Sequence, residues 1–311
     1  MSRGAAWRER SGMLLVFALL FVTLSLFVPN FFTQRNMLGL ALSVSTVGML
    51  ACTMLFCLAS GDFDLSVEAV VAFSGVLAAV IANATHSVAL GFAAGILAGG
   101  AVGLVNGTLI AGAGINALIV TLGTMQIVRG LGFLVSGGSA VSIADERFYA
   151  LGMNSLMGIP NPVWITLTCL VIFGIVLNTT RFGRHTLAIG GNRVAATLAG
   201  VPVHRVKILI FTVQGLVAGF AGVIMASRMT SGQPKSAEGL ALDVISACVL
   251  GGVSLSGGVA TMTGALVGVL IMGTVQNSMN LLNVPAFYQY VVRGSILLAA
   301  VGFDQWKRRR V

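Results

Sequence analysis

The stretch VALGFAAGILAGGAVGLVNGTLIAG, residues 88–112, decides the class of fold. It contains no charged side chain. A helix of about 20 apolar residues crosses a hydrocarbon core about 30 Å thick, so this stretch is long enough to span a membrane. Glycine recurs along it, and small residues let two membrane helices approach closely. The stretch therefore predicts a membrane-spanning helix that packs against another helix.

The composition of the whole chain supports the same class. Of its 311 residues, 57% are hydrophobic and 9% are charged, and the mean hydropathy is +0.97. A soluble domain carries about 25% charged residues, so water is not the main solvent of this chain. We expect an all-α integral membrane protein with a single transmembrane domain over residues 1–311, where length alone would suggest about two soluble domains.

About ten apolar stretches are candidates for membrane spans. They cover residues 12–29, 38–59, 67–83, 88–112, 115–136, 163–178, 208–229, 242–254, 258–282 and 288–303. The first follows three arginines, as in a signal peptide, but no small-x-small cleavage site follows it, so we expect a retained helix. The cysteines lie in apolar stretches without paired spacing, which predicts packing residues rather than disulfides or metal ligands: Cys52, Cys57, Cys169 and Cys248.

The distribution of cations predicts the orientation. The two chain ends and the segment 179–207 hold 12 of the 18 Lys and Arg residues. The positive-inside rule therefore predicts that both termini and this segment are cytoplasmic, which requires an even number of spans. The net charge of +9 does not indicate a nucleic-acid partner, because the cations cluster between apolar stretches.

The segment 179–207 reads TTRFGRHTLAIGGNRVAATLAGVPVHRVK. Residues 192–199 have a helix-forming composition, Asn192 is a good N-cap residue, and Gly200 stands where a left-handed residue ends a helix. A short helix with such sharp ends, between two membrane spans, predicts a docking surface. The opposite loop, 137–161, is long and carries short apolar stretches, which predicts a position on the membrane surface.

No sequence pattern for catalysis is present. The chain lacks the phosphate-binding pattern G-x-x-x-x-G-K-[ST], and the glycine-rich stretch 250–264 has no lysine to reach a phosphate. We find no metal-ligand spacing and no catalytic triad, and we predict no catalytic residue and no cofactor bound by this chain. Energy from ATP would have to come from a partner.

Three acids lie between the second and third apolar stretches, in SGDFDLSVE, residues 60–68. Acids at membrane depth are costly and are candidates for a transport path, here at a break between helices. Alternatively, Asp64 and Ser66 cap the helix 67–83, whose dipole an acid complements. Both interpretations apply to Asp62, Asp64 and Glu68.

Polar side chains within or near the ends of the other stretches have two interpretations each. Three arginines would either ring the outer mouth of a path or extend toward lipid headgroups: Arg129, Arg228 and Arg293. Six amides would either line a path for a neutral polyol or join helices by hydrogen bonds: Asn106, Asn116, Gln126, Gln276, Asn277 and Asn280.

Four segments carry a family resemblance: SGDFDLSV (60–67), LAIGGNRVAATLAGVPVHRVKI (187–208), SRMTSGQP (227–234) and VLGGVSLSGG (249–258). With them, nearly the whole chain resembles the membrane permeases of bacterial ABC-type monosaccharide importers, the ribose, xylose and arabinose group. The runs INALIVTLGTMQIVRG (115–130) and QYVVRGSILLAAVGFD (289–304) are most similar to its L-arabinose branch. Glu68 departs from the family pattern, which has a small residue there.

The resemblance implies a working arrangement in the bacterial inner membrane. Two permease copies, expected to be a homodimer, form one path, and a periplasmic binding protein delivers the sugar. Two cytoplasmic ATPase subunits, which bind ATP and Mg²⁺, grip residues 191–201, the coupling segment within the loop 179–207. They switch the path by alternating access. The coupling residues would be Gly191, Asn192, Arg193, Ala195, Ala196, Leu198, Gly200 and Val201.

Two other functions remain open from the residues alone. An ion-coupled secondary sugar transporter would use one of the acids in 60–68 as its ion site and would need no partner. A non-transporting membrane scaffold would need neither the acids nor the amides within its spans. The docking helix predicted in 179–207 disfavours the secondary transporter, since a self-sufficient carrier has no use for one.

Overall fold

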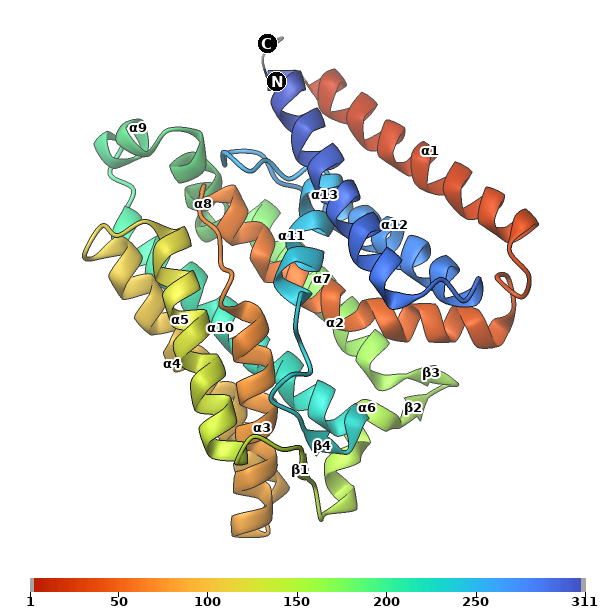
Figure 1. Ribbon diagram of the computed structural model, residues 1–311. Helices are drawn as coiled ribbons and strands as arrows, with labels where there is room; N and C mark the ends of the chain where they lie inside the picture. Colours follow the sequence, from red (N-terminus) through yellow and green to blue (C-terminus); the bar gives the residue numbers. More distant parts are fainter. Residues whose placement is uncertain (1–2, 309–311) are drawn as a thin grey trace.

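Helices make up most of the computed structural model, which describes the backbone of residues 3–308 and the side chains of residues 12–302 and Gln305 (Figure 1). The terminal cations counted in the sequence therefore lie outside the described side chains. The helices are α1 (Arg3–Phe27), α2 (Gln34–Ala59), α3 (Val67–Thr85), α4 (Val88–Ala111), α5 (Ala117–Ser136), α6 (Ala150–Met153), α7 (Asn161–Thr179), α8 (Arg181–Gly191), α9 (Arg193–Leu198), α10 (Val203–Met229), α11 (Leu240–Leu250), α12 (Met262–Leu281) and α13 (Ala286–Arg308).

Within residues 3–308, seven helices are long and apolar enough to cross a membrane: α2, α3, α4, α5, α7, α10 and α12. Three shorter apolar helical segments lie at Gly12–Phe27, Leu240–Leu250 and Ala286–Gly302. These ten segments correspond one to one with the ten predicted stretches, and the described chain is mostly helical, with four two-residue strands beside the helices.

Some predicted boundaries were wrong at the polar ends of helices. Helix α10 begins at Val203 rather than 208, because Lys207 is buried and paired instead of lying in a loop. Helix α11 ends at Leu250 rather than 254, and α12 begins at Met262 rather than 258. The residues between them form a glycine turn, with Gly252, Gly257 and Gly258 at positive φ.

Helices α3, α4 and α10 meet through glycines, which we call the glycine seam: Gly75 on α3, Gly95, Gly99 and Gly103 on α4, and Gly215, Gly219 and Gly222 on α10. A Cβ atom at Gly219 would lie 2.8 Å from the Gly95 carbonyl oxygen, and one at Gly75 would lie 2.8 Å from the Gly222 carbonyl oxygen. Residues four apart share one face of a helix. The seam therefore brings backbones into direct contact, as the glycine content predicted.

Two helices begin in the middle of the molecule, each after a non-helical segment (Figure 1). Residues 60–66, the first break, lead from the end of α2 to α3, and residues 233–239, the second break, lead to α11. The second break follows β4 (Ser231–Gly232), which pairs antiparallel with β1 (Val141–Ser142).

The segment 137–160 packs against the end of α10. It contains a 3-10 helix, η1 (Glu146–Tyr149), the short α6, and the two-residue strands β2 (Ser155–Leu156) and β3 (Ile159–Pro160). The Ser227 hydroxyl donates to the Phe148 carbonyl at 2.8 Å and accepts from the Gly152 N–H at 2.8 Å. A side-chain hydrogen bond from Arg147 lowers the pKa of the exposed Asp145.

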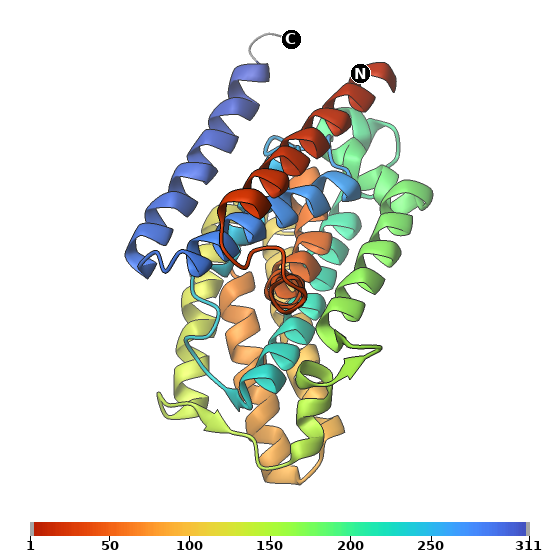
Figure 2. The same ribbon diagram turned by 90° about the vertical axis from the view of Figure 1, so that its right-hand side faces the viewer.

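Figures 1 and 2 place both ends of the described chain at the same end of the molecule as α8 and α9. We call this the α9 end and the opposite one, with β1 and β4, the β1 end. Three helices terminate toward the α9 end in the same way, with a left-handed glycine after the helix: Gly61 after α2, Gly200 after α9 and Gly252 after α11. Each glycine N–H and the following N–H bond back to the last helical turn, which satisfies free carbonyls.

Candidate functional site

The first acid of the candidate site, Asp62, forms a buried ion pair. Its Oδ2 lies 2.7 Å from Lys207 Nζ, and the two side chains are 11% and 8% exposed. The pair joins the first break to the first turns of α10. A buried ion without a partner costs several kcal/mol, so each charge requires the other. Lys207 had been counted among the loop cations in the sequence, which was wrong.

The second acid, Asp64, organises the start of α3. Its Oδ1 accepts from the Ser66 N–H at 3.0 Å and from the Ser66 hydroxyl. The Ser66 hydroxyl also accepts from Asn106 Nδ2 on α4 at 2.9 Å. Ser66 holds the N-cap position of α3 but makes no side-chain cap bond. The expected serine cap is corrected, because the hydroxyl is already used by Asp64 and Asn106.

The third acid, Glu68, links three helices. Its Oε1 accepts from Arg129 Nη2 on α5, and its Oε2 accepts from the N–H of Gly239, the N-cap residue of α11, at 3.0 Å. The carboxylate therefore lies where the two breaks meet, at the starts of α3 and α11. Sequence reasoning had singled out Glu68 and Arg129 separately but had not paired them.

The three arginines have three different partners. Arg129 pairs with Glu68, and Arg293 Nη1 lies 3.1 Å from Oδ2 of Asp243 on α11. Arg228 Nη1 lies 3.5 Å from the Leu42 carbonyl oxygen. Two of the arginines therefore pair with acids, of which Glu68 is buried and Asp243 is half-buried. Asp243 was missed, although an acid within an apolar stretch is the signal that had identified Glu68.

The predicted amides divide by environment. Asn277 exchanges two hydrogen bonds of 2.9 Å with Asn36 and so joins α12 to α2. Asn116 caps α5 by accepting from the Leu118 N–H at 2.9 Å. Asn280 accepts from Gln289 at 3.0 Å, and Gln126 is exposed. The structure thus shows Asn277 and Asn280 joining helices, one of the two predicted roles.

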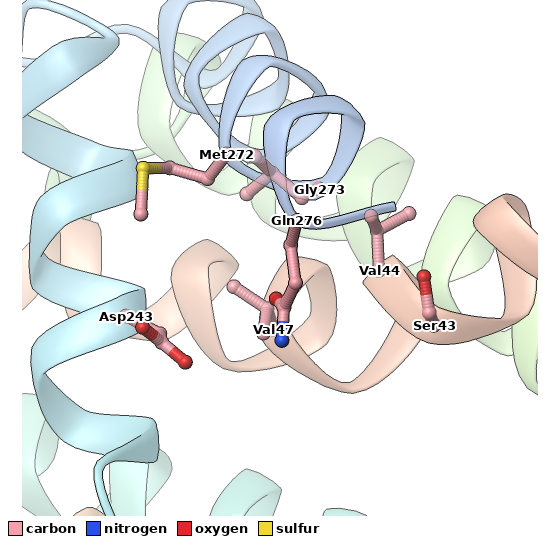
Figure 3. A pocket seen from close by; sticks show the side chains of 8 residues that line it. Ser43, Val44, Val47, Asp243, Met272, Gly273 and Gln276 are labelled. Atoms are coloured by element: carbon pink, nitrogen blue, oxygen red, sulfur yellow. The ribbon is translucent and has the colours of Figure 1, made fainter. Parts of the chain in front are cut away.

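A small polar cavity lies between α2, α11 and α12 (Figure 3). It measures about 20 Å³, enough for about one water molecule. Ser43, Asp243 and Gln276 supply its polar groups. Gln276 is the one predicted path residue that lines it, and Ser43 was not predicted.

Helix α9 stands at the α9 end with an apolar surface open to its surroundings. The Asn192 side chain accepts from the Ala195 N–H at 2.9 Å, and Gly200 has φ +81°, so both predicted helix ends are confirmed. Val194 is 70% exposed and Leu198 is 85% exposed. Most of the predicted coupling residues are exposed, Val201 is half-buried, and Ala196 is buried and holds α9 in place. The preceding helix α8 was not predicted.

The cysteines are free, as their spacing predicted, and three of them are buried. Unpartnered polar atoms are few among the described side chains. They include Asn106 Oδ1 and both amide atoms of Gln214, a fully buried residue of α10 that sequence reasoning missed. One glutamine within an apolar helix is a weak signal, because membrane helices often carry single amides.

Comparisons of the sequence with known proteins identify the family of this chain. The family described as "Branched-chain amino acid transport system / permease component" matches residues 36–301. The L-arabinose ABC transporter permease protein of Azospirillum brasilense is 60% identical over 311 residues, covering 99% of this chain and 92% of that protein. The L-arabinose transport system permease protein of Escherichia coli K12 is 60% identical over 99% of this chain and 94% of its own length.

A more distant relative widens the group. The ribose import permease protein of Bacillus subtilis 168 is 38% identical over 96% of this chain and 94% of its own length. No solved structure matches the chain. The resemblance inferred from the four sequence segments is confirmed. The chain belongs to the branched-chain amino acid transport system / permease component family and is a non-catalytic, multi-pass membrane permease subunit of a bacterial ABC transporter.

Proposed function

We propose that this permease carries L-arabinose across the inner membrane, receiving it from a periplasmic binding protein and drawing energy from partner ATPase subunits that bind ATP and Mg²⁺. The observation that carries the substrate is the full-length similarity to two L-arabinose permeases at 60% identity, against 38% to the ribose permease. The observation that carries the energy source is α9, with its exposed Val194 and Leu198.

The proposed topology has ten crossings in one transmembrane domain, with both termini cytoplasmic. The ten apolar helical segments support it, as does the common position of the chain ends, α8 and α9. The exposed cations Arg181, Arg184 and Arg193 lie in the same segment. By the positive-inside rule, the α9 end then faces the cytoplasm.

Helix α9 is the proposed docking element for the ATPase. Large apolar side chains outside a membrane span are otherwise covered, so Val194 and Leu198 suit a partner with an apolar groove. The fixed ends of α9, capped by Asn192 and closed by Gly200, support a rigid contact. A second copy of this permease would complete the proposed path and bring a second α9 to a second ATPase subunit.

The proposed path runs past the residues predicted from the sequence: Asp62, Asp64, Glu68, Asn106, Asn116, Gln126, Gln276, Asn277 and Asn280, with Arg129, Arg228 and Arg293 toward its mouth. The small cavity at Gln276 supports this position for one of them. The ion pairs of Asp62 and Glu68 disfavour ion-coupled transport, because an ion site requires an acid that is free to exchange its partner.

Reconstitution into proteoliposomes tests the proposal. The permease, its ATPase and its sugar-binding protein should hydrolyse ATP faster, and take up L-arabinose, only when the binding protein is loaded with sugar. Replacing Leu198 by Ser should abolish both activities while the permease remains folded. The matched control is Thr197→Ser, a conservative change at an exposed position of the same helix. Uptake driven by an ion gradient without ATP would contradict the proposal.

A further inference from the structure

A connection of four residues, 199–202, leads from α9 to α10. The Gly200 N–H donates to the Thr197 carbonyl at 3.0 Å, and the Val201 N–H donates to the Ala196 carbonyl at 3.0 Å. Helix α10 begins at Val203, so Lys207 lies about one turn into it. The Val203 N–H donates to the Val201 carbonyl at 2.8 Å, so the short connection leads directly into the part of α10 that carries Lys207.

Lys207 in turn holds the start of the first break. Among the described residues, Asp62 is the acid within ion-pair distance of Lys207 Nζ, at 2.7 Å. The Asp62 N–H also donates to the Cys57 carbonyl at 3.0 Å, which closes the end of α2. Asp62 thus stands at the point where α2 ends and the chain turns toward α3.

The far end of the first break carries the next contacts. Glu68 lies in the first turn of α3 and bonds to both Arg129 of α5 and the Gly239 N–H at the start of α11. Asp243 of α11 then pairs with Arg293 of α13. A series of ion pairs, together with the first break, therefore links the start of α10 to the N-terminal ends of α3 and α11.

A second set of contacts fixes the surroundings of Asp62. The Gly258 N–H donates to the Ala59 carbonyl at 2.9 Å. A Cβ atom at Gly257 would lie 2.7 Å from the Cα of Gly190, and one at Gly258 would lie 2.9 Å from the Cα of Gly191. The ends of α2 and α8 and the turn 254–258 therefore touch through their backbones, which we call the glycine junction. It accounts for the glycine-rich stretch that lacks a phosphate-binding lysine.

We propose that Lys207 and Asp62 are positioning residues that transmit displacement of α9 to the first break, and through Glu68 to the starts of α3 and α11. The glycine junction holds the ends of α2 and α8 together, so that movement of α10 changes the position of Lys207 relative to the Asp62 carboxylate. This inference rests on the proposed function, in which the ATPase moves α9. It assigns roles to a lysine and a glycine-rich turn that the transport function alone does not explain.

Three variants of the full chain test the pair. Asp62→Asn with Lys207→Met removes both charges and avoids leaving one charge buried alone, which would threaten folding. Asp62→Lys with Lys207→Asp reverses the pair. Asp145→Asn with Arg147→Gln removes an exposed ion pair elsewhere and is the matched control. Membrane yield and co-purification with the ATPase report folding and docking for each variant.

The first measurement is the stimulation of ATP hydrolysis by the sugar-loaded binding protein in the reconstituted complex. The complex with the neutral pair should assemble normally, but the stimulation of its ATP hydrolysis should be about tenfold smaller than in the wild type. A change of this size is within the usual range of coupling between sites. The reversed pair should recover a large part of the stimulation, and the control should match the wild type. Normal stimulation in the well-assembled neutral pair would overturn the inference.

The second measurement uses the permease alone, in lipid nanodiscs without the ATPase. Hydrogen exchange of residues 60–68 should be faster in the neutral pair than in the wild type, and the control should be unchanged. Unchanged exchange in the neutral pair would also overturn the inference. Because this measurement needs neither ATP nor sugar, it separates failure of the inference from failure of the proposed function, which would show as unstimulated hydrolysis by the wild-type complex.

Discussion

The glycine seam joins α3 to α10, and the first break leads into α3 and contacts α10 through Lys207. The two regions are nevertheless held by different kinds of contact. In the seam, backbones touch without side chains between them, as at Gly75 and Gly222. In the first break, contacts are made by the ends of charged side chains, as between Asp62 and Lys207. Steric contact between backbones permits one arrangement, whereas ion pairs tolerate some change in the position of their helices.

The difference indicates which parts of this permease move together. We expect α4 and α10 to move as one body, because the seam brings their backbones into direct contact. The breaks, where α3 and α11 begin, are held by a few directional contacts, so we expect conformational changes to occur there. Irregular backbone at membrane depth, buried within protein, is typical of transport proteins.

The largest effect is expected from filling the seam. Gly219→Leu should prevent folding, because its Cβ alone would lie 2.8 Å from the Gly95 carbonyl oxygen and the backbones would have to separate. The measurement is the yield of monodisperse permease after extraction from membranes. Gly123→Leu is the control, since this α5 glycine has open space around it and should be tolerated. Equal yields of the two variants would show that folding does not require the close backbone packing of the seam.

A smaller but substantial effect is expected from the meeting point of the two breaks. Glu68→Gln should destabilise the permease by about 3 kcal/mol, because it leaves Arg129 partly buried without its acid. Thermal unfolding in detergent measures the loss. The double change Glu68→Gln with Arg129→Gln should recover most of the stability. A single change without effect would mean that the carboxylate does not tie α3 to α5.

The smallest effect is expected outside both regions, at Asp145 and Arg147. The hydrogen bond from Arg147 lowers the pKa of Asp145, so its stabilisation is present above the ordinary pKa of the carboxyl and is lost as pH falls through the lowered value. Because ion pairs at the surface contribute little, Asp145→Asn should lower the melting temperature at pH 7 only slightly. A pH titration of the melting temperature, with and without the substitution, measures this. A clear loss at pH 7 would show that the segment 137–160 depends on the pair.

Much of this architecture was predictable from local sequence. Hydropathy located all ten apolar helices, and the ends of α9 followed from Asn192 and Gly200, because capping depends on neighbouring residues alone. The family followed from four short segments. Helix α8 was missed because its arginines and histidine give it no apolar length, although it is amphipathic.

The partners of the charged residues were not predictable. Lys207 is read from the sequence as a loop cation, since the chain around it is basic, and only the packing of α10 against the end of α2 buries it. Glu68 on α3 and Arg129 on α5 have the whole of α4 between them in the chain, and no local rule pairs them. Which groups meet at a break depends on the tertiary arrangement, whereas which residues are apolar does not.

Helix α10 has 27 residues without interruption. With a rise of 1.5 Å per residue it is a rod about 40 Å long, and tilting such a rod by about 5° about one end shifts the other by about 3.5 Å. Its first turns carry Lys207, and its last turn holds the segment 137–160 through Ser227. In the proposed function, a small displacement of α10 by the ATPase at the α9 end would thus become a shift the size of an atom at the β1 end, where we propose that the binding protein delivers the sugar.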